Sequence, residues 1–188
     1  MSIDTNIILR AFPITLANDI HVILDNIPLA PITASQEFFT VRIHSETLHI
    51  PHRIYCAAPD PALINELMPQ QSKILCCLLT RHHSGYMREL YLKQLLLPGC
   101  CDVWIIPYVI RLLGEYVIEI LQVINDNLHL IDTAMLRGFI KDNPEFIKTT
   151  ESRVMSYWNE YYRLAHPRQD SYVGFKILNY FDEIARNH

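Results

Sequence analysis

The densest group of residues that could do chemistry lies between Thr80 and Arg88, in the stretch Thr-Arg-His-His-Ser-Gly-Tyr-Met-Arg. Free backbone N–H groups at the start of a helix attract anions, and arginine grips carboxylate or phosphate through two parallel hydrogen bonds. The stretch therefore predicts an anion or acidic-peptide site, with the candidate binding residues Arg81, His82, His83, Tyr86 and Arg88. The alternative is a capped turn in which Arg88 forms an internal ion pair.

A second group consists of Arg111, Glu115 and Glu119, which follow one another at intervals of four residues. On a helix, that spacing puts all three on one face, so the two carboxylates could share a proton, hold a cation or supply a general base. An ordinary ion pair beside a solvated carboxylate is the alternative. No metal site is predicted here, because neither glutamate has a histidine within three residues. Gly114 marks either a close helix–helix approach or room for a ligand.

Four aromatic residues lie between Arg153 and Arg163, and Tyr162 is the candidate binding residue among them. Tyrosine, tryptophan and arginine dominate protein–protein hot spots, and aromatic rings with arginines can also stack on bases. The competing interpretation is a helical stripe that packs into the core. Nucleic acid is the least favoured partner, because the formal net charge of the chain is -4.

The histidines and cysteines predict neither a metal centre nor a disulfide framework. His44, His49 and His52 fit no established zinc-ligand spacing, so we expect them to face solvent. Four of the five cysteines form the adjacent pairs Cys76-Cys77 and Cys100-Cys101, which indicates free thiols in a reducing cytoplasm. The chain has no Gly-rich phosphate loop and no G-x-S-x-G, H-E-x-x-H or C-x-x-C motif, so no cofactor is expected.

The elements that would position these residues are mainly helical. Alternating apolar and polar residues before and after His44-Ser-Glu46 predict a β-hairpin that ends at Pro51. Pro28 and Pro31 are predicted to end an N-terminal helix.

From residue 59 onward, apolar residues recur at helical spacing between short linkers, with predicted caps at Asp60 and Asp132. The longest such run predicts one central helix over residues 107–128, whose apolar stripe includes Tyr116. Further helices are predicted over residues 132–141, from residue 143 to a stop at residues 166–167, and around residues 175–184. The longest uninterrupted apolar run, Val103–Ile110, is too short to span a membrane, and no signal peptide is expected.

The predicted helix of residues 84–96 resembles the second helix of a HEAT-type repeat, in which a basic residue follows an apolar one after a turn. Met87 and Arg88 would be that pair, although Tyr91 or Leu92 replaces the small residue usually found soon after. The resemblance covers about one repeat unit, and no second copy is evident. It implies an α-helical scaffold whose concave face binds another macromolecule.

These observations predict a mainly α single domain over residues 1–188: a helical bundle or short HEAT-like array with an N-terminal β-hairpin, divided into a segment 1–58 and a helical core 59–188. The expected function is non-catalytic, cytoplasmic protein binding, as in a bacterial immunity protein or antitoxin that blocks a toxin. The alternative is a small helical enzyme or anion-binding protein with a site formed by the Arg81–Arg88 turn and Glu115 or Glu119. Half of the residues are apolar, which also allows a homo-oligomer.

Overall fold

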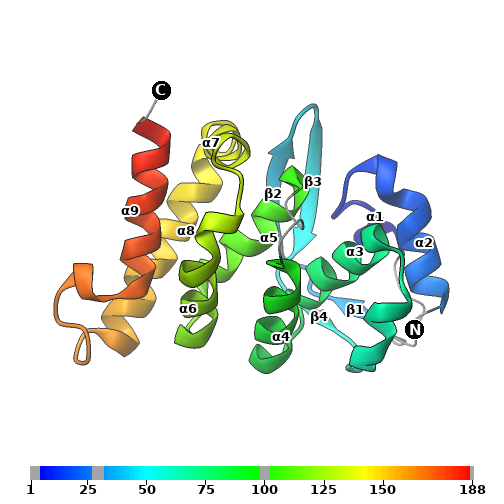
Figure 1. Ribbon diagram of the computed structural model, residues 1–188, viewed down its shortest axis with the longest axis horizontal. Helices are drawn as coiled ribbons and strands as arrows, with labels where there is room; N and C mark the ends of the chain where they lie inside the picture. Colours follow the sequence, from blue (N-terminus) through cyan, green and yellow to red (C-terminus); the bar gives the residue numbers. More distant parts are fainter. Residues whose placement is uncertain (1–4, 27–31, 98–101, 187–188) are drawn as a thin grey trace. The chain divides into compact units, whose positions relative to one another are not determined.

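The structure is a computed structural model that describes residues 5–26, 32–97 and 102–186. It contains two compact units, unit 1 over Met1–Leu95 and unit 2 over Leu96–His188, and each is described by itself. The fold is mainly α with an N-terminal β-hairpin, as the sequence predicts (Figure 1). The predicted helix stops at Pro28 and Pro31, and the thiols of Cys100 and Cys101, lie outside the described residues.

Unit 1 opens with short helices and the predicted hairpin. Helix α1 (Thr5–Leu9), the 3-10 turn η1 (Ile14–Leu16) and helix α2 (Ala17–Asn26) precede strands β2 (Phe38–Ile43) and β3 (Glu46–Pro51). The strands pair antiparallel from Phe38↔Pro51 to Ile43↔Glu46, and His44 adopts the positive φ of a tight turn. One face of the hairpin is buried through Val41, Ile43, Leu48 and Ile50.

A second, smaller sheet in unit 1 was not predicted. Strand β1 (Thr33–Ala34) pairs antiparallel with β4 (Ile54–Tyr55), and each has only two residues. So short a pairing has no alternating pattern that a sequence could reveal. It brings the segment after the hairpin back beside the segment before it.

The remainder of unit 1 is helical. The 3-10 helix η2 (Pro61–Glu66) begins at the predicted cap, where the Asp60 side chain accepts a hydrogen bond from the Ala62 amide at 2.9 Å. Helices α3 (Pro69–Leu79) and α4 (Gly85–Leu95) pack on each other. Cys76 and Cys77 on α3 are buried and form no disulfide, as expected for small core residues.

Unit 2 contradicts the prediction of one helix over residues 107–128. The chain instead forms η3 (Val103–Ile105), α5 (Ile106–Arg111), the 3-10 turn η4 (Leu112–Gly114) and α6 (Ile118–Asn127). Glu115 is extended, with φ -117° and ψ 155°. A Cβ on Gly114 would lie 2.9 Å from the Cδ atom of Arg153, so Gly114 marks a close approach of η4 to the next long helix, as one of the two predictions for it stated.

The C-terminal part of unit 2 follows the predicted boundaries closely. The elements are η5 (Leu128–Leu130), α7 (Thr133–Asp142), α8 (Pro144–Tyr157), the π-helical turn η6 (Trp158–Tyr162), η7 (Gln169–Ser171) and α9 (Val173–Arg186). Asp132 caps α7 by accepting a 2.8 Å hydrogen bond from the Met135 amide. Helix α9 packs on α6, α7 and α8 and buries Ile177, Phe181 and Ile184. Among the helices of the described residues, none is both long and apolar enough to cross a membrane.

Candidate functional site

The predicted site in unit 1 is a turn that the backbone ties to strand β4. Helix α3 ends at Leu79, and the Arg81 carbonyl then accepts a 2.8 Å hydrogen bond from the Ile54 amide. The Ile54 carbonyl in turn accepts from the His83 amide at 3.0 Å. His82 is therefore held beside Ile54 as an isolated parallel bridge. The position of the turn is fixed by the small sheet that the sequence did not reveal.

Both ring nitrogens of His82 have partners. The Nδ1 atom accepts a 3.1 Å hydrogen bond from the Ser84 amide, and Nε2 lies 3.1 Å from the Cys56 carbonyl. Because a carbonyl only accepts, this arrangement requires the neutral ring with its proton on Nε2. Burial lowers the pKa of His82, and the neighbouring His83 and Arg88 lower it further against the opposing effect of the Cys56 carbonyl. The arrangement makes His82 a structural link between the turn and the segment after β4.

Arg88 is also positioned by the turn. Its Nη1 donates to the carbonyl oxygens of His82 and His83, at 2.9 Å each, and the residue is only 1% exposed. Arg81 is likewise buried. Of the five predicted binding residues, His83 and Tyr86 are exposed: the His83 ring stacks on Tyr55 at 5.5 Å, and Tyr86 is 72% exposed. Binding of a ligand by these residues stays a prediction.

The predicted pair of carboxylates does not lie on one helical face. Glu115 is buried in the extended segment between η4 and α6, whereas Glu119 is exposed in the first turn of α6. The expected spacing was wrong because the helix breaks at Gly114. Both glutamates belong to unit 2 and the Arg81–Arg88 turn belongs to unit 1, so the combined site of the alternative function stays a prediction.

The break in unit 2 creates a feature that the sequence interpretation missed. Tyr116, from the break, meets Tyr157 of α8 and Tyr161 of η6, with ring centroids 6.4 and 6.3 Å away; the Tyr157 and Tyr161 rings stack at 6.0 Å. Tyr116 is 54% exposed and Tyr161 is 62% exposed. We call these three residues the tyrosine surface. Tyr116 was assigned to a core stripe only because an unbroken helix was assumed.

Tyr162 contacts the backbone of the tyrosine surface at Tyr116. Its hydroxyl donates to the carbonyl oxygen of Tyr116, and its ring stacks on the buried Tyr172 at 5.3 Å. Burial raises the pKa of Tyr162, and the nearby charge of Glu119 raises it further, so the hydroxyl stays a donor at neutral pH. Tyr162 was predicted as a binding residue, and its geometry makes it the anchor that fixes the backbone of Tyr116.

The π-helical turn η6 orients these tyrosines. Such turns are rare and occur often at functional sites. Here it follows α8 directly, and the Trp158 indole donates a 2.9 Å hydrogen bond to the His166 carbonyl. The Arg163 guanidinium lies over the same ring, 5.7 Å from its centroid. The turn thus holds a buried tryptophan on one side while it presents Tyr161 to solvent on the other.

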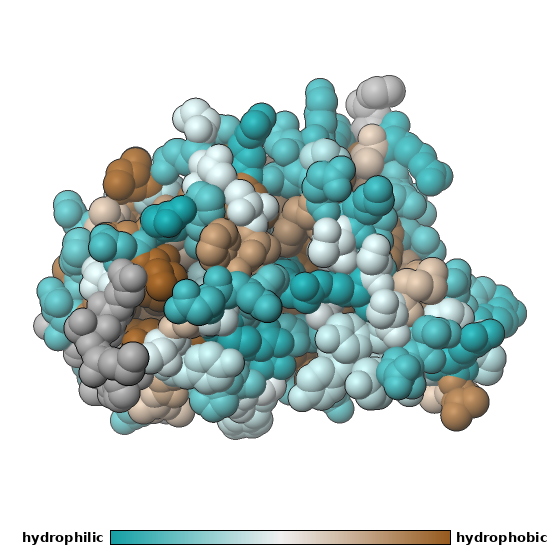
Figure 2. All heavy atoms as spheres, turned by 180° about the vertical axis from the view of Figure 1, so that it is seen from behind, coloured by the Kyte–Doolittle hydropathy of each residue, from teal (hydrophilic) through white to brown (hydrophobic). Residues whose placement is uncertain are grey.

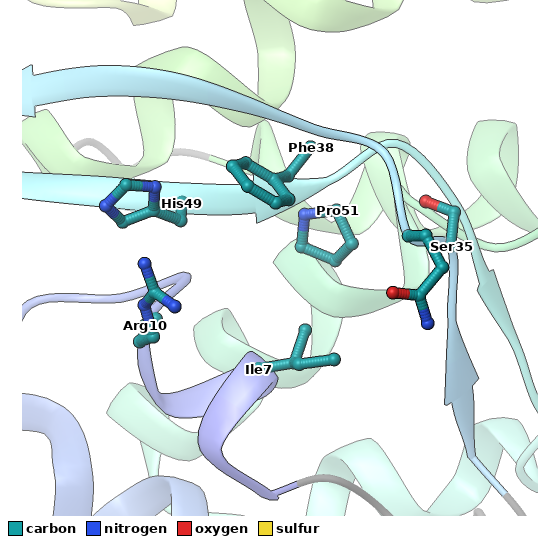
Figure 3. A pocket seen from close by; sticks show the side chains of 7 residues that line it. Ile7, Arg10, Ser35, Phe38, His49 and Pro51 are labelled. Carbon is teal, nitrogen blue, oxygen red and sulfur yellow. The ribbon is translucent and has the colours of Figure 1, made fainter.

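Unit 1 also contains a pocket with a cavity volume of about 70 Å³ between the end of α1 and the hairpin (Figure 3). Its walls include Ile7, Arg10, Phe38, His49 and Pro51, none of which the sequence had grouped together for binding. The pairing of His49 with Arg10 depends on how α1 packs on β3, which no local pattern reveals. Within the ranges that the structure describes, no group of three or more His, Cys, Asp or Glu side chains could hold a metal ion.

Comparisons with known proteins do not assign this arrangement to a family. No family model matches the chain, and no curated protein or solved structure matches it either.

Proposed function

We propose that the chain is a non-catalytic protein-binding module and that its contact residues are those of the tyrosine surface, Tyr116, Tyr157 and Tyr161. The observation that carries this proposal is the mutual contact of the three rings, two of which are more than half exposed, on a backbone that Tyr162 fixes. Tyrosine loses little conformational entropy on binding and offers both apolar area and a hydroxyl group. Rings held in place before binding reduce that entropy loss further.

The polarity of the surface around the tyrosines favours a partner that the protein binds reversibly. Hydrophilic side chains predominate around the C-terminal helices on the face shown in Figure 2, with apolar side chains in small groups between them. Interfaces of proteins that also exist alone are about as polar as the rest of the surface, with aromatic residues enriched at the centre. The face of unit 2 seen in Figure 2 has this mixed, mainly polar character.

The acidic residues beside the tyrosines favour a partner with a basic face. Glu119 lies close enough to Tyr162 to raise the pKa of its hydroxyl, and Glu160 is an exposed neighbour of Tyr161. Such charges speed the encounter of two proteins more than they tighten the complex. A toxin that a bacterial immunity protein or antitoxin blocks is one partner of this kind. Among the described residues, Cys56, Cys76 and Cys77 form no disulfide, which agrees with a cytoplasmic location. The HEAT-like resemblance of residues 84–96 stays a prediction, and the proposal does not depend on it.

The test is to capture the partner from the native cells through a C-terminal tag, purify it, and measure its Kd by calorimetry. Tyr161→Ala should weaken the complex at least tenfold, because truncation of a hot-spot tyrosine costs about 2 kcal/mol. The matched control is Tyr86→Ala, which removes a similarly exposed tyrosine from unit 1. It should leave the Kd within twofold.

The opposite pattern would contradict the proposal. If Tyr86→Ala weakens the complex and Tyr161→Ala does not, the contact surface is the turn in unit 1 and not the tyrosine surface. Light scattering of the purified chain distinguishes a second copy as the partner: a dimer that Tyr161→Ala dissociates would make the tyrosine surface a homo-oligomer interface. Both variants should melt within a few degrees of the native protein, because each replaces an exposed side chain.

A further inference from the structure

The pocket in unit 1 lies on the face of the hairpin opposite its buried apolar residues. Register pairs Phe38 with Pro51 and Thr40 with His49, so Phe38, His49 and Pro51 share this face. The end of α1 lies at the edge of β3 beside this face, because the His49 amide, which points along the plane of the sheet, donates a 2.8 Å hydrogen bond to the Arg10 carbonyl. This backbone contact fixes the two walls relative to each other and does not use the Arg10 side chain.

One end of the pocket is polar and cationic. Figure 3 shows the side chains of Arg10 and His49 facing each other across the opening. Within residues 5–26, 32–97 and 102–186, the structure gives the Arg10 guanidinium no acidic partner, and the Nδ1 atom of His49 is buried without a hydrogen bond. A buried ring nitrogen that lacks a partner and a cation beside it together favour a polar, anionic ligand group at this end.

The middle of the pocket is apolar. Ile7 points into it from α1, with Phe38 and Pro51 on the opposite wall (Figure 3). The Phe38 ring packs edge-on against the His49 ring at 5.6 Å, so the apolar and polar parts adjoin. At the far end, the Ser35 hydroxyl is already engaged, since it donates to the Glu37 carbonyl at 2.7 Å and accepts from the Arg53 amide at 3.1 Å. The ligand's anionic group is therefore expected near Arg10.

We propose that this pocket binds a small organic acid. Its carboxylate pairs with the Arg10 guanidinium beside His49, and its apolar body lies against Ile7, Phe38 and Pro51. The cavity volume is only about 70 Å³, below the range for pockets that enclose a drug-sized ligand, so the pocket suits a small molecule that stays partly exposed. The apolar walls and the single arginine favour a carboxylate with a hydrocarbon body over an inorganic phosphate, which needs more donors.

The first test compares phenylacetate with phenylacetamide, its neutral counterpart of nearly the same shape, in titrations of the full chain followed by NMR. Phenylacetate should bind saturably, with a Kd in the range of about 1 mM, and shift the signals of Ile7, Phe38 and His49. Phenylacetamide should bind at least tenfold more weakly. Equal binding of acid and amide, or no binding of phenylacetate at about 10 mM, would overturn the proposal. This comparison needs no substitution.

The second test asks whether Arg10 supplies the positive charge that pairs with the ligand's carboxylate. Arg10→Gln should weaken phenylacetate binding at least tenfold, whereas the matched control Arg42→Gln, an exposed arginine of the same hairpin outside the pocket, should change it less than twofold. Equal losses in both variants would show attraction to general positive charge and overturn the site. The result is separable from the proposed function, because Tyr161→Ala should leave phenylacetate binding unchanged.

Discussion

The turn at Arg81–Arg88 and the break at Glu115–Val117 are two interruptions between helices with opposite outcomes. In the turn, the buried side chains of His82 and Arg88 form hydrogen bonds with backbone groups that the end of the helix leaves unpaired. At the break, a side chain also satisfies a freed carbonyl, through the Tyr162 hydroxyl, but the segment directs Tyr116 into solvent.

Residue type alone therefore does not distinguish a binding site from a scaffold. The histidines and arginines of the turn looked reactive in the sequence, yet His82 and Arg88 hold the backbone with their polar groups. The tyrosines of unit 2 looked like core residues, yet two of the three rings of the tyrosine surface are more than half exposed. What decides between these roles is whether the backbone offers the side chain an internal partner.

The structural role of the Arg81–Arg88 turn is tested most strongly by Arg88→Met, for which we expect a loss of about 3 kcal/mol in the free energy of unfolding. The substitution keeps an apolar stem but leaves the carbonyls of His82 and His83 without their buried donor. The control is Arg163→Met, which removes an exposed arginine that contacts Asn159 and the Trp158 ring and should cost less than about 1 kcal/mol. Urea unfolding at neutral pH measures both. Similar losses for the two variants, or loss of ligand binding in Arg88→Ala at an unchanged melting temperature, would give Arg88 a binding role instead.

Substitution of two glycines by alanine tests how tightly the helices of unit 2 are packed. A Cβ on Gly174 would lie 2.7 Å from the Tyr172 ring and 2.8 Å from Val154, so Gly174→Ala should destabilise the protein by about 2 kcal/mol through overpacking. Gly138 lies on α7 with nothing within 4 Å of the added methyl group, so Gly138→Ala should stabilise by about 0.5–1 kcal/mol. Opposite shifts in melting temperature are the expected result. A stabilised Gly174→Ala variant would mean that α8, α9 and Tyr172 are packed less tightly than described.

Much of the fold was predictable because its signals are local. Alternation gave the hairpin and its turn, and the caps at Asp60 and Asp132 gave two helix starts. The failure at residues 107–128 has a physical cause. An apolar periodicity continues through Gly114, whereas the packing of Arg153 against this glycine comes from a distant part of the chain and leaves no local pattern.

The candidate sites were less predictable for the same reason. Tyr162 was found from its residue type, but Tyr116 depends on the break and was missed. The pocket needs Arg10 and His49 together, which are joined by a backbone hydrogen bond between segments far apart in sequence. Small sheets such as β1–β4 and packing across such distances leave no periodic pattern.

The turn in unit 1 should also respond to pH. Burial lowers the pKa of His82 in the folded protein, so the unfolded chain takes up a proton at a higher pH than the folded one. The stabilisation from neutral His82 is therefore complete above the ordinary histidine pKa of about 6.5 and is lost as the pH falls through the lowered folded value. Unfolding free energies measured from neutral pH downward should show this decline. It should shrink in His82→Gln and persist in His129→Gln, which replaces an exposed histidine; an identical decline in both variants would assign it to other groups.

The smallest expected effects separate two stacked tyrosines in unit 2. Tyr162→Phe removes the donor to the Tyr116 carbonyl and should cost about 1 kcal/mol. Tyr172→Phe removes a buried hydroxyl that has no hydrogen-bond partner in the described part of the chain, so stability should stay the same or rise slightly. Urea unfolding of the two variants gives the ordering, and the reverse ordering would place the anchoring hydrogen bond on Tyr172. Because only Tyr162 fixes the backbone of Tyr116, Tyr162→Phe alone should also weaken partner binding, which connects the interior of unit 2 to its exposed surface.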